Sequence, residues 1–235
     1  MLIAFDLWGD YAHFSHPATI YSSLSYPIPP KTTIMGFLGA IIGLAEYEKL
    51  SDLKYSVKLN TPLKKKTMIF NGVKFALSSS MKLEYGYQDS SEKKQFYKEL
   101  ICNPNYTIYL NLKNLDKSFQ DKIYKNIKEH KSVYTPYLGV NFCIADFKFK
   151  EIQNFSRIND EQTYVSSFVL ESDFIFDKDN FSTKLASYTM PCAVESGRIF
   201  KEFKNFIVEI NSGKLLAKNN GGIYETNGER FYFVW

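Results

Sequence analysis

The sequence has few cysteines and few histidines, and both shortages limit what it can be. Its 3 cysteines among 235 residues are far apart and odd in number. They provide neither a disulfide framework nor a zinc cluster, so a reducing compartment, the cytoplasm, is expected. The pattern "HFSH" holds two of the 3 histidines, but no further ligands accompany it. No metal and no other cofactor is therefore expected.

Long hydrophobic runs are also absent. The apolar run from Ile34 to Ala45 falls well short of the about 20 residues that a membrane-spanning helix needs. Asp6 interrupts the first apolar stretch, and no charged leader precedes it, so no signal peptide is expected. A buried helix is predicted at 34–45, and no membrane partner is expected.

Charge of either sign is modest. The net charge is +4 and the pI is about 8.7, which allows an anionic partner without requiring one. Arg157, Arg198 and Arg230 are the only arginines, a small number for a protein that binds nucleic acid. Aromatic residues, in contrast, reach 17%, and some of these rings are expected at the surface, where they can stack. An AT-rich genome would produce the same excess of Phe and Tyr.

Hydrophobic periodicity predicts an α+β protein. Alternation predicts strands at 2–8, 54–60, 106–112, 139–149 and 166–176. Helices are predicted at about 32–45, with Pro30 suited to the first turn, and at 115–130, where apolar residues repeat every fourth position. Turn dipeptides predict hairpins at 71–72, 212–213 and 227–228, and the polar stretch 78–104 reads as a mobile excursion.

The first 150 residues therefore read strand, helix, strand, excursion, strand, helix, strand. This order is the ferredoxin-like βαββαβ plan, which RRM domains share and whose sheet face they use for RNA. Residues 151–235 form a smaller β-rich C-terminal region. In the first helix, Gly36, Gly39, Ala40 and Gly43 share one face, and we expect that face to approach a sheet closely.

Three segments carry a resemblance to a known family. They are "YAHFSHP" at 11–17, "YPIPPKTTIMGFLGAIIG" at 26–43 and "VYTPYLGVNF" at 133–142, and "MPCAVESGRIFKEF" is a looser fourth. In order and spacing they resemble the fifth CRISPR-associated protein family of the RAMP superfamily, in a type I-B-like form. The resemblance implies a ferredoxin-like domain with a thumb inserted at about 61–105.

The resemblance also implies a function in antiviral defence. It implies a non-catalytic, RNA-binding subunit of a type I CRISPR Cascade complex that holds the repeat-derived 5′ handle of crRNA. The implied partners are the Cascade backbone subunit and the large subunit, with target DNA reached only indirectly. One branch of the family instead cuts the repeat RNA without metal.

The residues themselves indicate where RNA would bind. A helix start with a lysine and two threonines offers unpaired N–H groups, hydroxyls and positive charge to a phosphate. Rings in the loop after the first strand can stack on bases, and clustered lysines bind phosphates. The candidate RNA-binding residues are Tyr11, His13, His16, Tyr26, Lys31, Thr32, Thr33, Lys64, Lys65, Lys66 and Arg198.

Structural explanations compete with each of these assignments. The helix start can be an ordinary cap, several rings can be loop or core packing, the lysine run can be a solvated loop, and Arg198 can pair with Glu195 or Glu202. Two other functions also stay open. A metal-independent endoribonuclease would draw its acid and base from Tyr26, His130 and Lys131. A protein-interaction scaffold would make no RNA contact.

Overall fold

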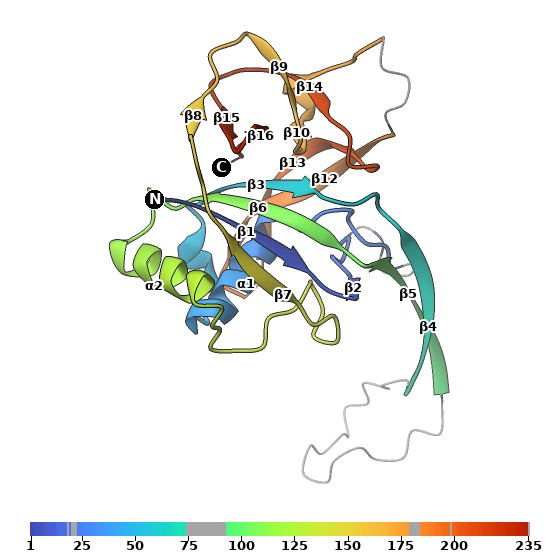
Figure 1. The fold of residues 1–235 in the computed structure, drawn as a ribbon. Helices are drawn as coiled ribbons and strands as arrows, with labels where there is room; N and C mark the ends of the chain where they lie inside the picture. The colour runs from blue at the N-terminus through green and yellow to red at the C-terminus, as the bar shows by residue number, and fades with distance from the viewer. Residues whose placement is uncertain (18, 20–22, 74–92, 179–183, 198, 235) are drawn as a thin grey trace.

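The structure is a computed structural model that describes residues 1–17, 19, 23–73, 93–178, 184–197 and 199–234. Its centre is a four-stranded sheet in the order β3-β6-β1-β7, in which every neighbouring pair is antiparallel (Figure 1). The strands are β1 (Leu2–Trp8), β3 (Lys54–Leu59), β6 (Asn105–Asn111) and β7 (Asp146–Lys150). Helix α1 (Lys31–Ile42) lies between β1 and β3 in the chain, and α2 (Lys117–Lys128) lies between β6 and β7.

One face of this sheet packs against the helices. Alternation in β1 places Ile3, Phe5 and Leu7 in the core. Phe37 of α1 stacks on Phe5 at 5.7 Å between ring centroids and meets Phe147 of β7 edge-on at the same distance. Helix α1 is apolar all round and mostly covered, whereas α2 buries only the stripe facing the sheet.

The opposite face of the sheet is covered by a C-terminal hairpin. Strands β15 (Ile223–Thr226) and β16 (Glu229–Tyr232) meet at the predicted Asn227–Gly228 turn, where both residues have positive φ. Phe231 stacks on Tyr109 of β6 at 4.0 Å with nearly parallel rings. Next to it, Val234 exchanges two backbone hydrogen bonds with Tyr55 at the edge of β3. The C-terminal region thus completes the sheet.

A long two-stranded ribbon leaves the body between β3 and β6. It consists of β4 (Lys65–Val73) and β5 (Lys93–Cys102), and its base pairs with the short strand β2 (Tyr11–Ala12). The predicted hairpin at Asn71–Gly72 is wrong, since β4 runs through both residues and pairs them with Gln95 and Lys94. Neither residue has the positive φ of a tight turn, and the Phe96 ring lies where a side chain at position 72 would point.

The part of the 78–104 excursion from 93 to 102 is therefore strand rather than mobile loop. The part from 78 to 92 lies outside the described residues.

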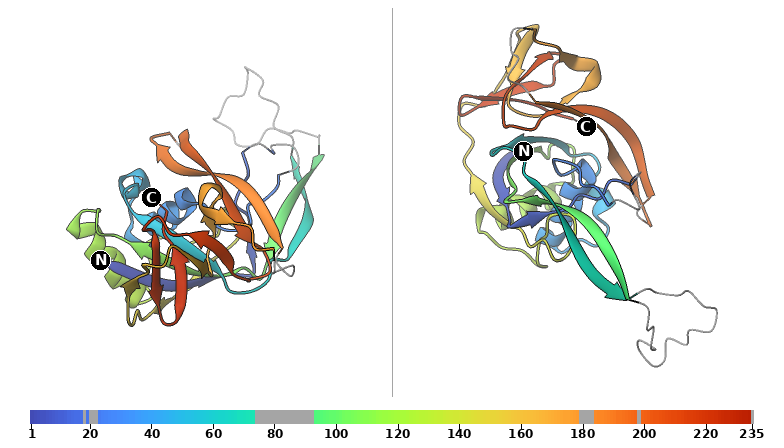
Figure 2. Two further views of the ribbon diagram at one scale, coloured as in Figure 1. Left: turned by 90° about the horizontal axis from the view of Figure 1, so that it is seen from above. Right: turned by 90° about the vertical axis from the view of Figure 1, so that its right-hand side faces the viewer.

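The remaining strands form three-stranded sheets around the C-terminal region. Their bounds are β8 Ser156–Arg157, β9 Gln162–Val165, β10 Val169–Leu170, β11 Phe174–Ile175, β12 Leu185–Glu195, β13 Ile199–Glu209 and β14 Leu215–Lys218, and two short 3-10 helices are Tyr47–Leu50 and Glu171–Asp173. β12 and β13 form a long curved hairpin that reaches down beside α1 (Figure 2).

Several predicted boundaries are wrong for local reasons. The strand predicted at 166–176 is interrupted at Glu171–Asp173, where Asp173 turns inward to accept hydrogen bonds from Tyr232 and Asn220. The turn near Ser212 joins strands of two different sheets, so it closes no hairpin. Helix α1 ends at Ile42 because Gly43 adopts a left-handed conformation with φ 74°.

The strand predicted at 139–149 begins only at Asp146. Residues 139–145 form a loop instead. The backbone N–H of Leu138, just before this loop, donates a hydrogen bond to Cys143 O. No helix within the described ranges is long and apolar enough to span a membrane.

Candidate nucleic-acid interface

The loop 133–139 is fixed between α1 and the loop that follows β1. Val133 and Tyr134 donate their backbone N–H groups to the carbonyls of Ile41 and Ala40, which helix α1 leaves unpaired in its last turn. On the other side, His13 donates its N–H to Leu138 O at 3.0 Å. Gly139, with φ 88°, lies so close to His13 O that no Cβ would fit. Three segments far apart in the sequence therefore meet at one place.

A groove of about 420 Å³ opens where these segments meet. We call it the α1 groove; it is lined by Thr32, Thr33, Gly36, Phe37, Gly39, Ala40, Leu44, Ala45, Tyr47, Tyr134, Thr135, Tyr137, Gly139 and Phe200. Its walls carry exposed rings, with Tyr134 62% and Phe200 42% accessible, and threonine hydroxyls from the first turn of α1 and from Thr135. No charged side chain belongs to this described lining.

Small residues of α1 form the floor of this groove, so the prediction that their face approaches a sheet is wrong. A Cβ at Gly36 would meet nothing within 4 Å, so that face is open. A Cβ at Gly39 would meet Leu44 O, and one at Gly43 would meet Val133. The close approach that the glycines permit is to loops, because the backbone of residues 133–134 binds the end of α1.

The start of α1 is more enclosed than predicted. Pro30 is the N-cap residue, and its carbonyl accepts from the N–H groups of Thr33 and Ile34. Lys31 is 3% exposed, and its ammonium donates to Ser51 O at 2.6 Å. Burial lowers the pKa of Lys31. The groove therefore receives the threonines of this turn, whereas Lys31 has a partner inside the protein.

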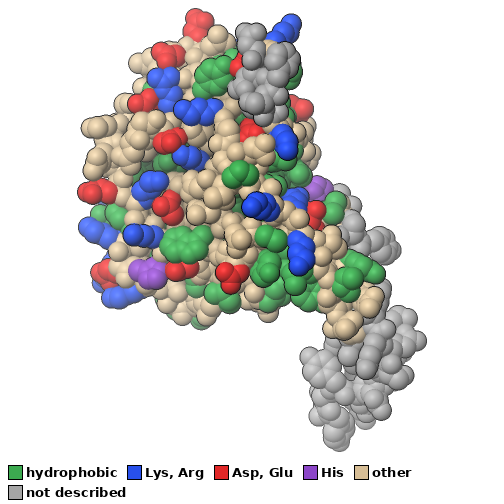
Figure 3. All heavy atoms as spheres, turned by 45° about the vertical axis from the view of Figure 1, so that its right-hand side comes forward, with side chains coloured by type: hydrophobic (Ala, Val, Ile, Leu, Met, Phe, Trp, Pro, Cys, Tyr) green, Lys and Arg blue, Asp and Glu red, His purple; other side chains and the backbone are tan. Residues whose placement is uncertain are grey.

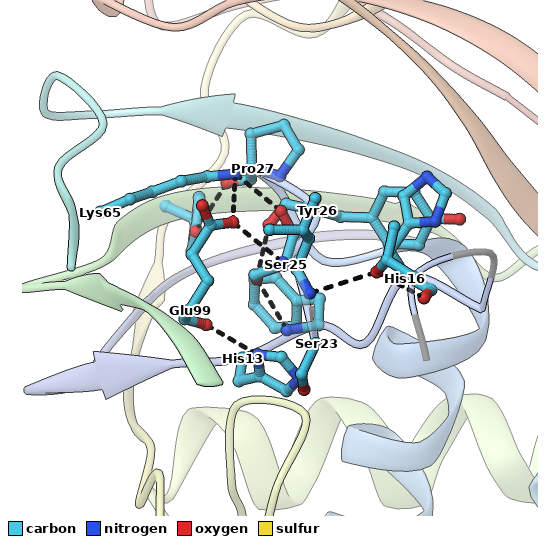
Figure 4. A network of polar contacts seen from close by, with 12 residues as sticks. His13, His16, Ser23, Ser25, Tyr26, Pro27, Lys65 and Glu99 are labelled. Carbon is cyan, nitrogen blue, oxygen red and sulfur yellow. Dashed lines mark hydrogen bonds and ion pairs between the residues drawn. The ribbon is translucent and has the colours of Figure 1, made fainter. Parts of the chain in front are cut away.

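A second cluster joins the base of the ribbon to the loop 13–27 (Figure 4). We call it the Glu99 network, after the residue of β5 at its centre. One carboxylate oxygen of Glu99 accepts from Lys65 Nζ at 2.8 Å and from the N–H of Ser25 at 3.0 Å. The backbone N–H of Glu99 donates to Ser23 O, and Lys65 also donates to Ser25 O. The network fixes the direction in which the ribbon leaves the body.

His13 belongs to this network and is fully buried. Its Nδ1 lies 2.8 Å from Glu99 O, and because a carbonyl only accepts, Nδ1 carries the proton. Burial lowers the pKa of His13, and the neighbouring ammonium groups of Lys98 and Lys65 lower it further, against opposing effects of Glu99. His13 is therefore buried against the ribbon, and its lowered pKa favours the neutral form.

The rings of the same loop differ in exposure. Tyr26 is buried, donates its hydroxyl to Thr189 O at 2.7 Å, and has a pKa raised by burial to about 12. His16 packs on it at 4.6 Å between centroids and is half-buried. Tyr11 is 38% exposed and lies in β2, beside the ribbon.

The lysine run divides between two environments. Lys64 and Lys66 are exposed at the base of the ribbon, whereas Lys65 points into the Glu99 network. Figure 3 shows hydrophobic side chains gathered near the place where the ribbon leaves the body, with basic side chains beside them. The exposed hydrophobic residues of the ribbon and of the neighbouring loop are Ile69, Phe96, Tyr97, Phe142 and Ile144. Arg198 lies outside the described residues.

The three candidate catalytic residues are not brought together. His130 lies beyond α2, where Nε2 is 2.7 Å from Asp146 Oδ1 and the ring packs on Phe147. Lys131 pairs with Glu129. Tyr26 instead bonds to β12. Within the described ranges, no group of three or more His, Cys, Asp or Glu residues is placed to hold a metal ion.

Part of the outer face of the four-stranded sheet is covered by the C-terminal region. Phe231 stacks on Tyr109 of β6, whereas Trp8 of β1, on the same face, is only half-buried. Tyr109 is 2% exposed and Phe231 is 1% exposed. Exposed rings lie in the α1 groove and on the ribbon, and also at Phe176 and Tyr164 of the C-terminal region.

Sequence reasoning missed most residues of the α1 groove. Tyr134, Thr135, Tyr137 and Phe200 were not singled out, although all four fall within the quoted segments "VYTPYLGVNF" and "MPCAVESGRIFKEF". The quoted segments themselves were the signal in the sequence, since several of them contribute residues to the α1 groove.

Residues 2–174 match the family described as CRISPR-associated protein (Cas_Cas5). The chain belongs to this family. The match includes the first three quoted segments, whereas "MPCAVESGRIFKEF" at 190–203 lies outside it. No curated protein matches the Cas5-family chain.

Solved structures share its fold at low sequence identity. A chain of a "CRISPR RNA-guided surveillance complex" has a TM-score of 0.58 and 11% identity, and the match covers 89% of this chain and 90% of that one. A CRISPR protein from Archaeoglobus fulgidus has a TM-score of 0.55 and 12% identity over 98% of both chains. A chain of a Type III-B Cmr-beta complex bound to cognate target RNA and AMPPnP has a TM-score of 0.52 and 13% identity, covering 92% and 86%. The shared property is the α+β fold with mostly antiparallel sheets.

Proposed function

We propose that this Cas5-family chain is a non-catalytic RNA-binding subunit of a type I CRISPR Cascade effector complex. In this proposal it holds the repeat-derived 5′ handle of crRNA. Membership of the family and the likeness of its fold to chains of CRISPR surveillance and Cmr complexes support a place in an effector complex.

The single observation that carries RNA binding is the α1 groove. The groove combines exposed rings, hydroxyls at a helix start and a lining without carboxylates. Unpaired bases stack on aromatic rings, and helix starts favour phosphates. The stacking of Phe231 on Tyr109 supports the same assignment, because it covers part of the sheet face that RRM domains use.

The sheet order supports a ferredoxin-like core for this proposal. Strands β1, β3, β6 and β7 with helices α1 and α2 follow the βαββαβ order, and the ribbon β4–β5 stands where the inserted thumb is expected. We assign the exposed ribbon residues to contact with a neighbouring backbone subunit, since large exposed apolar residues mark protein interfaces.

The test uses the full chain and end-labelled repeat RNA in EDTA. A native gel at rising salt is expected to show handle-dependent binding that survives physiological salt, and a denaturing gel is expected to show intact RNA. Specific cleavage would favour an endoribonuclease, and His130→Ala would then be the first variant to test. Binding that is blind to sequence and disappears by physiological salt would favour a protein scaffold.

A further inference from the structure

The hairpin β12–β13 is bent at an unusual place. Glu202, a non-glycine residue in the middle of β13, has φ 53°, in the left-handed region that strand residues avoid. The strand pairing runs from Pro191–Phe203 to Ala193–Lys201 and skips the pair between them. A backbone strained in this way persists only where its surroundings enforce it, and such residues concentrate at functional sites.

The end of the hairpin that carries Glu202 lies at the α1 groove. β12 packs against α1, and Phe200, two residues before Glu202, lines the groove. The Phe200 ring is 42% exposed although it lies in the groove wall, so it is not there to fill the core. Tyr134 and Tyr137 line the groove from a different segment and are also exposed.

We propose that Phe200 and the rings of the loop 133–139 form a clamp for one unpaired RNA base, with α1 as its floor. The open face at Gly36 leaves room for a flat ring against the helix backbone. The groove volume of about 420 Å³ lies within the usual range of small-ligand pockets. Its hydroxyls at the start of α1 offer donors to a phosphate, and its lining carries no carboxylate to repel one.

This inference rests on the proposed RNA binding and adds a role for the C-terminal region. An apolar peptide is the less favoured occupant, because threonine and tyrosine hydroxyls line much of the groove. Any base can stack on the rings of this groove, because every base presents a π-face.

The experiment places 2-aminopurine, a fluorescent base, at successive positions of a single-stranded repeat RNA and titrates each RNA with the full chain. The wild type is expected to quench the fluorescence strongly at one position, because stacking quenches this base. Phe200→Ala should weaken binding about tenfold and abolish that quenching. Phe200→Tyr should retain both.

Phe203→Ala is the matched control, since Phe203 is exposed on the same hairpin but does not line the groove. It should bind and quench like the wild type. Glu202→Gly, which tolerates positive φ, should retain binding, whereas Glu202→Val should weaken it by straightening the hairpin.

The outcomes separate the inference from the function on which it rests. If Phe200→Ala binds and quenches like Phe203→Ala, the clamp is wrong and RNA binding stands. If Phe200→Ala binds RNA normally but no longer joins the other subunits, the groove receives a protein, and the clamp is again wrong. If the wild type binds no RNA, both proposals fall.

Discussion

The α1 groove and the Glu99 network lie on either side of the loop that follows β1, yet they use their side chains in opposite ways. In the network, Lys65 bonds to the Glu99 carboxylate, and the fully buried His13 bonds to the backbone carbonyl of Glu99. In the groove, rings and hydroxyls line an open volume. The polar side chains of the network therefore have partners inside the protein, whereas the rings of the groove are exposed.

This difference shows why residue type alone is a poor guide to a candidate RNA-binding surface. Lysines and histidines are the usual candidates because phosphate is anionic. An ammonium that bonds a carboxylate or carbonyl inside the protein is less available to a phosphate. Lys31 and Lys65 are both in that position. Availability, which depends on the fold, decides which candidates remain.

The largest change in stability is expected at Glu99, the centre of the network. Glu99→Ala leaves the Lys65 ammonium and the Ser25 N–H without their shared acceptor, and we expect a loss of about 2 kcal/mol in the free energy of unfolding. Urea denaturation followed by circular dichroism measures it. Lys66→Ala, an exposed neighbour, is the control and should change stability by less than about 0.5 kcal/mol. Equal effects of the two variants would show that the Glu99 network does not stabilise the fold.

Two glycines of α1 test whether the groove binds RNA. Gly36→Ala should raise the free energy of unfolding by up to about 1 kcal/mol, because alanine favours helix and its methyl meets open space. The same methyl enters the groove, so RNA affinity should fall. Thermal denaturation and a binding titration on one preparation check both effects.

Gly39→Ala provides the contrast within the same helix. Its Cβ would lie 2.8 Å from Leu44 O, so this variant should lose stability. A stabilised Gly36→Ala protein with unchanged RNA affinity would show that the groove is not part of the RNA-binding surface.

The smallest expected effect is a pH dependence from His13. Its pKa is lowered in the folded protein, so below about pH 6.5 the unfolded chain binds more protons than the folded one. The free energy of unfolding should therefore decline as the pH falls from 7 through 6 and toward the lowered pKa. His13→Gln, which removes the titrating group and retains a donor, should show a shallower decline. Identical pH profiles would show that His13 does not carry this effect.

The sequence predicted the regular elements of the sheet well because their signals are local. Alternation located β1 within its observed bounds, and the repeat of apolar residues located α2. Two Asn-Gly pairs, at 71–72 and 227–228, show where local signals end. Asn227–Gly228 is a turn because short strands on both sides pair with each other. Asn71–Gly72 carries the same signal but continues a strand, because its partner lies more than twenty residues further along the chain.

The candidate site was predicted as segments rather than as residues. The segments with Tyr11, Lys31 and Tyr137 do meet, but which side chains face outward depends on contacts that no local pattern encodes. His13 lies inside, where its ring donates to Glu99 O, and Phe200 lines the groove from a hairpin distant in the sequence.

The pairing of Val234 with Tyr55 has a consequence for biosynthesis. A ribosome makes β3 long before it makes residue 234, so the outer edge of β3 and the Tyr109 face of the sheet emerge uncovered. Until the hairpin β15–β16 arrives, the nascent chain presents an unpaired strand edge next to an apolar face, which is the kind of surface that chaperones shield. Folding of the sheet is therefore completed only after most of the chain has been translated.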